Sequence, residues 1–461
     1  YTAVVTVALL TALATLLAMF TTLWFGGLLP LLTGGDAFPW IPVLQILGLL
    51  VLFSGFYSAV LLSLTSFAKS FKEAQAYLIP VMLLSLGPGM LSLMPGVTMS
   101  GAMAIAPLIN IVLLARDLLS GQVEPAAALA AVISTAAYAA AALAIAAKLF
   151  GSDAVTRTSE QSVGSLFRRP TTSSAVPSPQ AAAMMLALLV PIYFVVSNAL
   201  VRWLQAYRDS LTVSSQLMLN AIALIATFGV VPLIATYWGR NQYRTTYRMN
   251  RPSWISLMAG AVMGLGAWVV AHESFVLAQS LGIGMLDEDR IEQVLRTVGK
   301  LREAPPLLVL AAFALTPAVI EELCFRGYLF SALSRVLSPS RVIVVTAVLF
   351  GLFHVLTGNA LLIERFIPST LMGLILGWIA YRTGSVLPGM AVHFVHNALL
   401  MLVAYYHDRI SILGTDITSQ AHLPIAWILV ATAITGLCAW VISWNTAPRI
   451  RSLKAVPATH G

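Results

Sequence analysis

Three groups of polar residues interrupt apolar segments in the C-terminal half of the chain, and together they could hydrolyse an amide. The groups are Glu321 and Glu322 with Arg326, then His354, then His393 with Asn397. Ionisable residues inside apolar segments are costly, so such positions are candidates for function. Amide hydrolysis needs a base to activate water, donors for the developing oxyanion, and separation of the charges from lipid. We therefore expect these residues to meet in one buried site.

The spacing within each group assigns different tasks to its members. Glu322 and Arg326 lie four residues apart, in the acid-before-base order that favours pairing on a helix. This pair leaves Glu321, about 100° away around the helix, free to meet another partner and act as the base. A nearby His can hold the water or receive its proton. His393 and Asn397 share one helical face, from which both can donate to the oxyanion.

Two other interpretations of these residues stay open. Glu321, His354 and His393 could equally bind Zn²⁺ and leave a position for water, and the sequence does not decide between a metal-bound and a metal-free site. The residues could instead be polar pairs that tie helices together. Three such groups in one set of apolar segments favour chemistry over that role. His396 lies outside the pattern and is expected to serve helix packing.

The elements that must position these residues are predicted to be membrane helices. Of 461 residues, 59% are hydrophobic and only 10% are charged, with a mean hydropathy of +0.88. A soluble domain needs more charge than this to cover its surface. The net charge of +8 is concentrated in short loops, as the positive-inside rule predicts, and requires no nucleic-acid partner. Cys324 and Cys438 lie in apolar stretches and indicate no disulfide framework.

Apolar runs that could enter a bilayer recur along most of the chain. They cover residues 3–30, 40–65, 76–95, 102–115, 125–149, 182–201, 214–237, 254–271, 306–332, 341–357, 367–381, 386–405 and 424–444. Residues 151–181 are rich in Ser, Thr, Pro and charged residues and predict a cytosolic linker. The linker separates a membrane domain at 1–150 from a second one at 182–445.

We predict an all-α polytopic membrane protein with about four spans plus a re-entrant helix, followed by an eight-span helical bundle. Pro107 and Asn110 interrupt the run at 102–115, which is therefore expected to be re-entrant and covered by protein. Asp287–Glu303 places charged and apolar residues at helical spacing and predicts an amphipathic helix outside the bilayer. The chain begins at Tyr1 without a Met, so we expect further sequence upstream.

Basic residues predict the orientation of the second domain. One loop between two apolar runs is expected to be cytosolic because it carries Arg240, Arg244, Arg248 and Arg251. Residues 446–461 carry further basic residues and predict a cytosolic C-terminal tail. We therefore expect an integral multi-pass protein of the bacterial cytoplasmic membrane with its C-terminus in the cytosol.

The order of the polar motifs resembles the CPBP family, which includes CAAX prenyl endopeptidases and bacterial ABI-type intramembrane proteases. The similar elements are Glu321-Glu322-xxx-Arg326, Phe350-xxx-His354, Gly373–Gly377, Thr383–Pro388 and His393-xxx-Asn397. The resemblance implies that Glu321 is the water-activating base and His354 its partner. It also implies that Glu322 and Arg326 support them, and that the oxyanion side is formed by His393 and Asn397.

The N-terminal domain resembles the later spans of an ABC-2-type permease of the sodium-efflux kind. The resemblance rests on Ser66–Tyr77, Pro80, Pro107–Asn110 and Arg116–Gly121. It implies part of an exporter, in which a re-entrant element precedes the last span. A separate ABC ATPase subunit would then be a partner, because the chain has no Walker A sequence. Generic scaffold helices are the alternative.

The leading interpretation is an intramembrane endopeptidase of the CAAX protease type that acts on a membrane-associated protein or peptide and is fused to an exporter permease half. The alternative is an ABC-2 transporter permease subunit with a regulatory or non-catalytic protease-like domain. A third interpretation is a binding module that holds a partner's tail. Other protease signatures fail, since His272-Glu273 is followed by Val276 where HExxH needs its second His.

Overall fold

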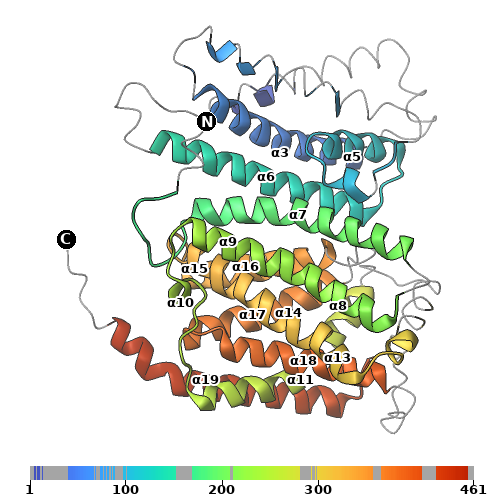
Figure 1. Cartoon of the computed structure of the whole chain (residues 1–461), viewed down its shortest axis with the longest axis vertical. Coiled ribbons are helices and arrows are strands. Elements are labelled where there is room, and N and C mark those ends of the chain that lie inside the picture. Colours follow the sequence, from blue (N-terminus) through green and yellow to red (C-terminus); the bar gives the residue numbers. More distant parts are fainter. Residues whose placement is uncertain are drawn as a thin grey trace. The chain divides into compact units, whose positions relative to one another are not determined.

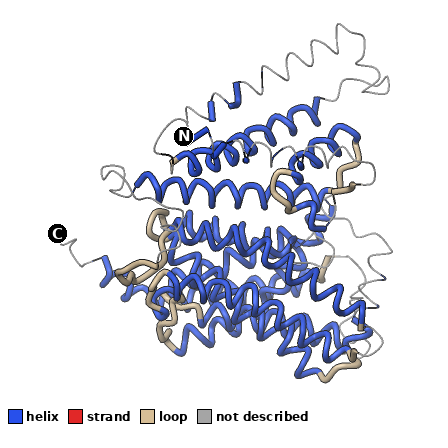
Figure 2. Tube along the Cα trace, turned by 45° about the horizontal axis from the view of Figure 1, so that its top comes forward, coloured by secondary structure: helices blue, strands red, loops and turns tan. Residues whose placement is uncertain are grey.

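The described part of the chain is built from helices and loops. In this computed structural model, residues 40–66, 101–151, 169–207, 211–280, 301–356, 365–406 and 422–454 are described as continuous stretches, with shorter pieces between 5 and 99 and between 292 and 300. These residues form no β-strand (Figure 2). Several of the helices are long and apolar enough to cross a membrane. The predicted class, an all-α polytopic membrane protein, is confirmed.

Seven helices in the described residues satisfy the length and hydropathy expected of a membrane span. They are Trp40–Thr65, Pro125–Ala147, Val213–Trp238, Trp254–Ser280, Pro306–Leu333, Leu387–Tyr405 and Ile425–Thr446. Two shorter apolar helices, Pro179–Leu189 and Pro339–Val355, lie between them in the sequence. The chain is therefore an integral multi-pass membrane protein.

The chain divides into two compact units. The first contains residues 1–168 and 183–191, and the second contains residues 169–182 and 192–461. The domain boundaries drawn from the sequence stay predictions. Several predicted segments lie wholly or mostly outside the described residues: the runs at 3–30 and 76–95, residues 152–168 of the linker, and the amphipathic helix Asp287–Glu303.

In the first unit, α5 (Ile109–Ser120) packs against α6 (Pro125–Gly151), and α3 (Trp40–Thr65) packs against both. At about 1.5 Å per residue, the 12 residues of α5 span about 18 Å, too little to cross a hydrocarbon core of about 30 Å. The buried Asn110 amide at the start of α5 donates to Ala131 O, Ser134 Oγ and Thr135 Oγ1. This short helix is therefore tied to α6 by a buried, hydrogen-bonded amide, and its re-entrant position stays a prediction.

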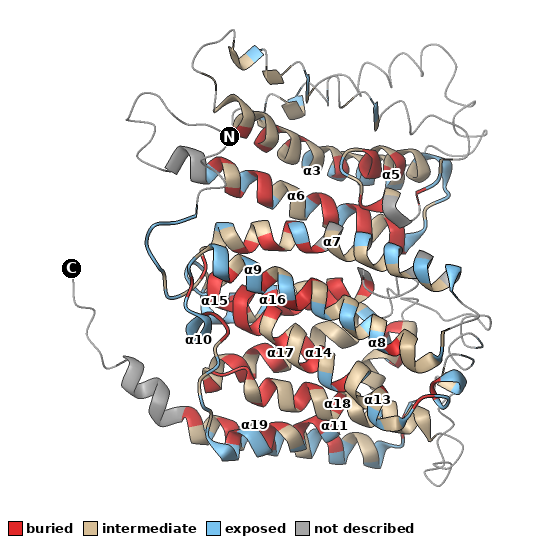
Figure 3. Ribbon diagram, viewed as in Figure 1, coloured by how far each residue is buried: buried red, intermediate tan, exposed pale blue. Residues whose placement is uncertain are grey.

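Besides the short helix α10 (Tyr243–Thr246), the described residues of the second unit contain eight longer helical stretches, labelled in Figure 1. They are residues 192–206 of α7 (Pro179–Ala206), α8 to α9 (Val213–Trp238), α11 (Trp254–Ser280), α13 to α15 (Pro306–Leu333), α16 (Pro339–Leu356), α17 (Phe366–Thr383), α18 (Leu387–Tyr405) and α19 (Ile425–Lys454). Five of these stretches contain a helix with the length and hydropathy of a membrane span, and the predicted number of eight spans stays a prediction. Its buried residues run along the facing sides of the helices, red in Figure 3.

Glycines let the helices of this unit approach closely. A Cβ at Gly260 or Gly264 of α11 would lie 2.6 or 2.7 Å from a carbonyl oxygen of α18. A Cβ at Gly373 of α17 would lie 2.8 Å from the Cα of Ala347 in α16. Small residues at such contacts are typical of membrane helix packing. They bring α11 close to α18 and α17 close to α16.

The connection between α17 and α18 is a tight turn. Gly384 adopts the left-handed conformation (φ 66°) after α17, which a Cβ would disfavour. α18 then begins at Leu387 with Pro388 in its first turn, where a missing N–H costs nothing. The Ser385 hydroxyl donates to Asn250 O and anchors the turn. The predicted Thr383–Pro388 element therefore sets where α18 starts.

Several loops and helix ends meet at one end of the second unit, which we call the basic end. It comprises residues 239–253, 334–338, 384–386 and 443–454. Part of the predicted linker packs here: Ser174 N donates to Arg240 O, and Gln242 N donates to Ser174 O. Composition alone did not predict this order, because it arises from backbone hydrogen bonds to a distant loop.

Candidate active site

The long helix that carries Glu321, Glu322 and Arg326 is not a regular α-helix. It runs through α13 (Pro306–Leu310), the π-helical turn η6 (Ala311–Leu315), α14 (Thr316–Glu322), the π-helical turn η7 (Leu323–Leu329) and α15 (Phe330–Leu333). A π-turn inserts a residue, rotates the side chains beyond it, and is often found at functional sites. The two glutamates lie directly between these turns.

Glu322 and Arg326 form the predicted pair. Arg326 Nη1 lies 2.9 Å from Glu322 Oε1, and both side chains are fully buried. Arg326 Nη2 also donates to the carbonyl of Gly373 on α17, at 3.2 Å. A buried arginine next to a carboxylate needs such additional hydrogen bonds to offset its desolvation. The pair therefore links α14 to α17.

His393 extends this pair to α18. Its Nδ1 lies 3.2 Å from Glu322 Oε1, and its side chain is only 4% exposed. Because the carboxylate paired with Arg326 can only accept, His393 Nδ1 must donate, and its other nitrogen, Nε2, faces Glu321. The sequence placed His393 on the oxyanion side and did not predict its bond to Glu322.

Glu321 lies beside two imidazole nitrogens. Its Oε2 is 3.8 Å from His354 Nε2 and 4.0 Å from His393 Nε2. This oxygen has no hydrogen-bond partner in the described part of the chain. Each distance is too long for a direct hydrogen bond but is close to the roughly 4–4.6 Å between groups that share one water. These distances are compatible with one water placed between the carboxylate and an imidazole nitrogen.

The two sides of the site differ in access. The side chains of Glu321 and His354 are 12% and 26% exposed, whereas those of Glu322 and Arg326 are fully closed. The neighbouring glutamates are therefore divided between an open position and a sealed one.

The sequence motif around Phe350 orients His354. His354 Nδ1 lies 2.9 Å from the carbonyl oxygen of Phe350, and a carbonyl can only accept. In the neutral ring, Nδ1 therefore carries the proton and Nε2 keeps its lone pair toward Glu321. The Phe350 ring also packs 4.3 Å from the His354 ring and 4.1 Å from the Arg326 guanidinium carbon. We did not assign Phe350 a role from the sequence, although it stands in the motif.

Asn397 has a partner on the glutamate-bearing helix. Its Nδ2 donates to the carbonyl of Phe313, in the π-helical turn η6, at 3.2 Å. This bond directs the amide toward η6, and within the described residues no hydrogen bond joins it to Glu321. His396 is buried on α18, as expected of a packing residue. The oxyanion role of Asn397 stays a prediction.

The donors at this site do not match tetrahedral zinc as they are placed. Ligand atoms with bonds of about 2.0–2.1 Å lie about 3.3 Å apart around a tetrahedral ion, whereas Glu321 Oε2 is 3.8 and 4.0 Å from the imidazole nitrogens. No group of three His, Cys, Asp or Glu residues in the described chain is arranged to hold a metal. We therefore derive the chemistry from the side chains alone.

The segment that contains this site matches a known protein family. Residues 303–399 match the type II CAAX prenyl endopeptidase Rce1-like family. This segment contains all six candidate site residues, so the C-terminal part of the chain is similar to a family of CAAX proteases. No curated protein and no solved structure matches the chain. The family match lies outside residues 1–150, where the resemblance to a permease stays a prediction.

Proposed function

We propose that the second unit is an intramembrane endopeptidase of the CAAX protease type, which hydrolyses a peptide bond in a membrane-associated protein or peptide. The observation that carries this proposal is the position of Glu321, an unpaired carboxylate oxygen 3.8–4.0 Å from two imidazole nitrogens. The similarity of residues 303–399 to the Rce1-like family supports the same class of reaction.

Glu321 would act as the general base. A water between its Oε2 and the Nε2 lone pair of His354 would lose a proton to the carboxylate as its oxygen attacks the scissile carbonyl. His354 holds this water because its Nδ1 is committed to the Phe350 carbonyl. The protonated Glu321 would then return the proton to the leaving amine. The proton taken from the water is thus transferred to the new amine, and the Glu321 and His354 side chains return to their starting protonation states.

The closed residues would stabilise the transition state. His393 donates a hydrogen bond from Nδ1 to Glu322, and its Nε2 therefore faces Glu321. When protonated at both nitrogens, it can donate from Nε2 to the oxyanion. Glu322 Oε1 accepts the bond from His393 and also pairs with Arg326, and the pair holds the imidazole ring in place. They position His393 and do not touch the substrate.

Substrate trapping tests the proposal. Glu321→Gln should retain the substrate bound without cleaving it, and mass spectrometry of the captured proteins should identify a peptide that the unmodified chain cuts. Glu321→Ala and His354→Ala should both abolish that cleavage. Unchanged cleavage in these two variants would show that the site is not catalytic and would favour a regulatory or binding role for the unit.

For residues 1–150 we retain the proposal of a permease part. Its support is the short helix α5, which precedes the last span of the first unit, α6, as a re-entrant element would. Co-purification of an ATP-binding subunit with the full chain, and ATP-dependent efflux, would support it. Absence of both would leave these helices as scaffold. We also propose that the basic end of the second unit, with the C-terminus, faces the cytosol of a bacterial cell.

A further inference from the structure

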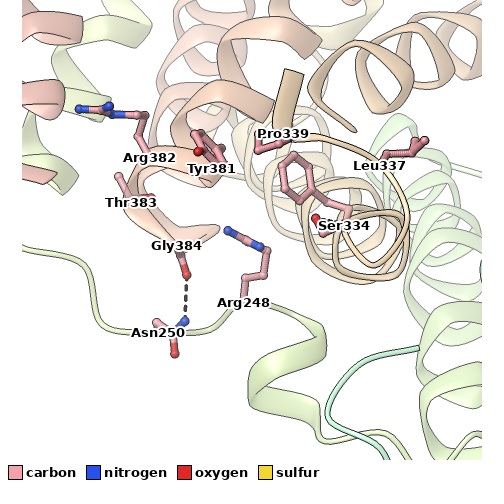
Figure 4. Close-up of a pocket in the computed structure, with 10 residues that line it drawn as sticks. Arg248, Asn250, Ser334, Leu337, Pro339, Tyr381, Arg382, Thr383 and Gly384 are labelled. Carbon is pink, nitrogen blue, oxygen red and sulfur yellow. Dashed lines mark hydrogen bonds between the residues drawn. The ribbon is translucent and has the colours of Figure 1, made fainter. Parts of the chain in front are cut away.

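A pocket opens at the basic end of the second unit, away from the candidate active site. Its volume is about 500 Å³, within the size range of small-ligand sites. It lies among Arg248 and Asn250 of the loop before α11, Phe330 and Ser334 at the two ends of the short helix α15, and Tyr381 near the end of α17 (Figure 4). Its lining includes polar side chains and the aromatic rings of Phe330 and Tyr381.

Arg248 is the charged group inside this pocket. Its guanidinium lies among the labelled residues in Figure 4, whereas Arg382 extends away from them and donates to Ser443 O. Arg248 Nη2 donates to the carbonyl of Ala380 at 2.9 Å, and its guanidinium carbon lies 4.9 Å from the Phe330 ring centre. Its buried Nε has no hydrogen-bond partner in the described residues.

A structural role accounts for only part of this arrangement. Capping the end of α17 uses Nη2 of Arg248 and leaves the buried Nε without an acceptor. The residue also adopts a left-handed backbone conformation (φ 50°), which is uncommon for a side chain other than Gly or Asn. Burial lowers the pKa of Arg248 from its ordinary value. A bound anion would supply the missing acceptor and the missing counter-charge.

The segments around the pocket contain no acidic side chain that could be the counter-charge of Arg248. Residues 239–256, 334–341, 381–386 and 443–454 contain no Asp or Glu. Their basic residues are Arg240, Arg244, Arg248, Arg251, Arg335, Arg341, Arg382, Arg449, Arg451 and Lys454. The potential at this end is therefore positive, and it would attract an anion from outside the protein.

Exposed aromatic residues place the pocket at the depth of lipid headgroups. Trp238 ends α9, Trp254 begins α11 and Trp444 lies near the end of the apolar span Ile425–Thr446 of α19, and they are 49%, 73% and 69% exposed. These helix ends meet at the basic end, since Asn445 Nδ2 donates to Ser256 Oγ. Tryptophans exposed at helix ends are typical of the membrane–water interface. An anion at this level is most abundantly a lipid phosphate.

We propose that this pocket binds a phosphate group, supplied by the headgroup of an anionic lipid. Arg248 contacts the phosphate oxygens through the guanidinium edge that includes Nε, in the forked geometry that arginine offers to phosphate. The Tyr381 hydroxyl, on the same side of the pocket, donates a second bond. The lipid links the loop before α11 to the end of α17 and so supports the turn from which α18 begins.

Native mass spectrometry of the purified full chain in a neutral detergent tests this site without measuring proteolysis. Phosphatidylglycerol is titrated against the unmodified chain, Arg248→Gln and the control Arg244→Gln, which removes the same charge from an exposed position of the same loop. Loss of charged hydrogen bonds predicts at least about tenfold weaker binding in Arg248→Gln. Arg244→Gln should bind as the unmodified chain does.

A parallel titration with inorganic phosphate separates the two sources of the anion. If phosphate binding depends on Arg248 and phosphatidylglycerol binding does not, the lipid assignment is overturned. Equal affinities of the two arginine variants for both phosphatidylglycerol and inorganic phosphate would overturn the site itself. Should Arg248→Gln not fold, Tyr381→Phe is compared with Tyr243→Phe, an exposed tyrosine of the same end. Several-fold weaker binding in Tyr381→Phe alone supports the pocket, and equal binding overturns it.

Discussion

The substitution of Glu by Gln should affect stability differently at the two adjacent glutamates. Glu322 is fully buried and accepts hydrogen bonds from two side chains, whereas Glu321 is partly exposed and has no such partners at its Oε2 in the described residues. Glu322 receives a 2.9 Å bond from Arg326 and a 3.2 Å bond from His393 and is fully buried. Glu322→Gln removes the counter-charge and leaves the Arg326 guanidinium buried and unpaired. Removing one partner of a buried ion pair costs about 3–5 kcal/mol.

Glu321→Gln should leave stability nearly unchanged. Its Oε2 accepts no hydrogen bond in the described chain, so a neutral amide of the same shape loses little. We expect a change within about 1 kcal/mol, the ordinary range for a substitution that breaks no bond. Activity should nevertheless fall by roughly 10²–10⁴, the contribution typical of a general base.

Thermal unfolding of the purified full chain in detergent measures this difference. At about 2–4 °C per kcal/mol for a domain of this size, Glu322→Gln should lower Tm by roughly 6–20 °C. Glu321→Gln should stay within about 4 °C of the unmodified chain. Glu273→Gln is the control for activity, since this glutamate contacts His422 and Leu423 instead of the candidate site. Equal losses of stability in the two adjacent variants would refute the assigned division of roles.

The same geometry leads to three further expectations. His354→Ala should reduce cleavage at least about 100-fold with only a small change in Tm, because it leaves no buried charge unpaired. Gly389→Ala should cost about 1–3 kcal/mol in unfolding measurements, since its Cβ would lie 3.3 Å from Glu322 Oε2, whereas Gly436→Ala, with open space around it, should not destabilise the chain. Chelators should leave cleavage unchanged, because the Glu321 and imidazole donors are too far apart for tetrahedral zinc. Loss of cleavage that added Zn²⁺ restores would contradict this last expectation.

Local spacing predicted the part of the site that one helix determines. The bond between Glu322 and Arg326 follows from their four residues of separation on a helix. The same geometry turned Glu321 toward other partners, and it lies beside His354 and His393. The meeting of the three polar groups was also predictable, because isolated ionisable side chains would be too costly at membrane depth.

The remaining contacts of the site depend on how the helices pack against one another. Whether His393 meets Glu321 or Glu322 depends on how far α18 is shifted along α14, and sequence spacing contains no information about that shift. Close contacts of Gly260 and Gly264 with α18 help to set it. The π-helical turns on either side of the glutamates also lie beyond sequence patterns, because each adds a residue without a distinctive composition. The Phe313 carbonyl that holds Asn397 belongs to one of these turns.

The contrast between the two glutamates explains why a base and an ion pair occur next to each other. The Glu322 carboxylate is held firmly because its Oε1 accepts from both Arg326 and His393, whereas Glu321 Oε2 accepts no hydrogen bond in the described residues and is available to water. Adjacent residues on a helix point about 100° apart, so one position can face Arg326 and His393 while the next faces the open side. The buried pair of Glu322 and Arg326 then holds His393, whose Nε2 lies 4.0 Å from Glu321 Oε2. The rigid network thus holds one boundary of the gap in which Glu321 works without occupying the oxygen that must react.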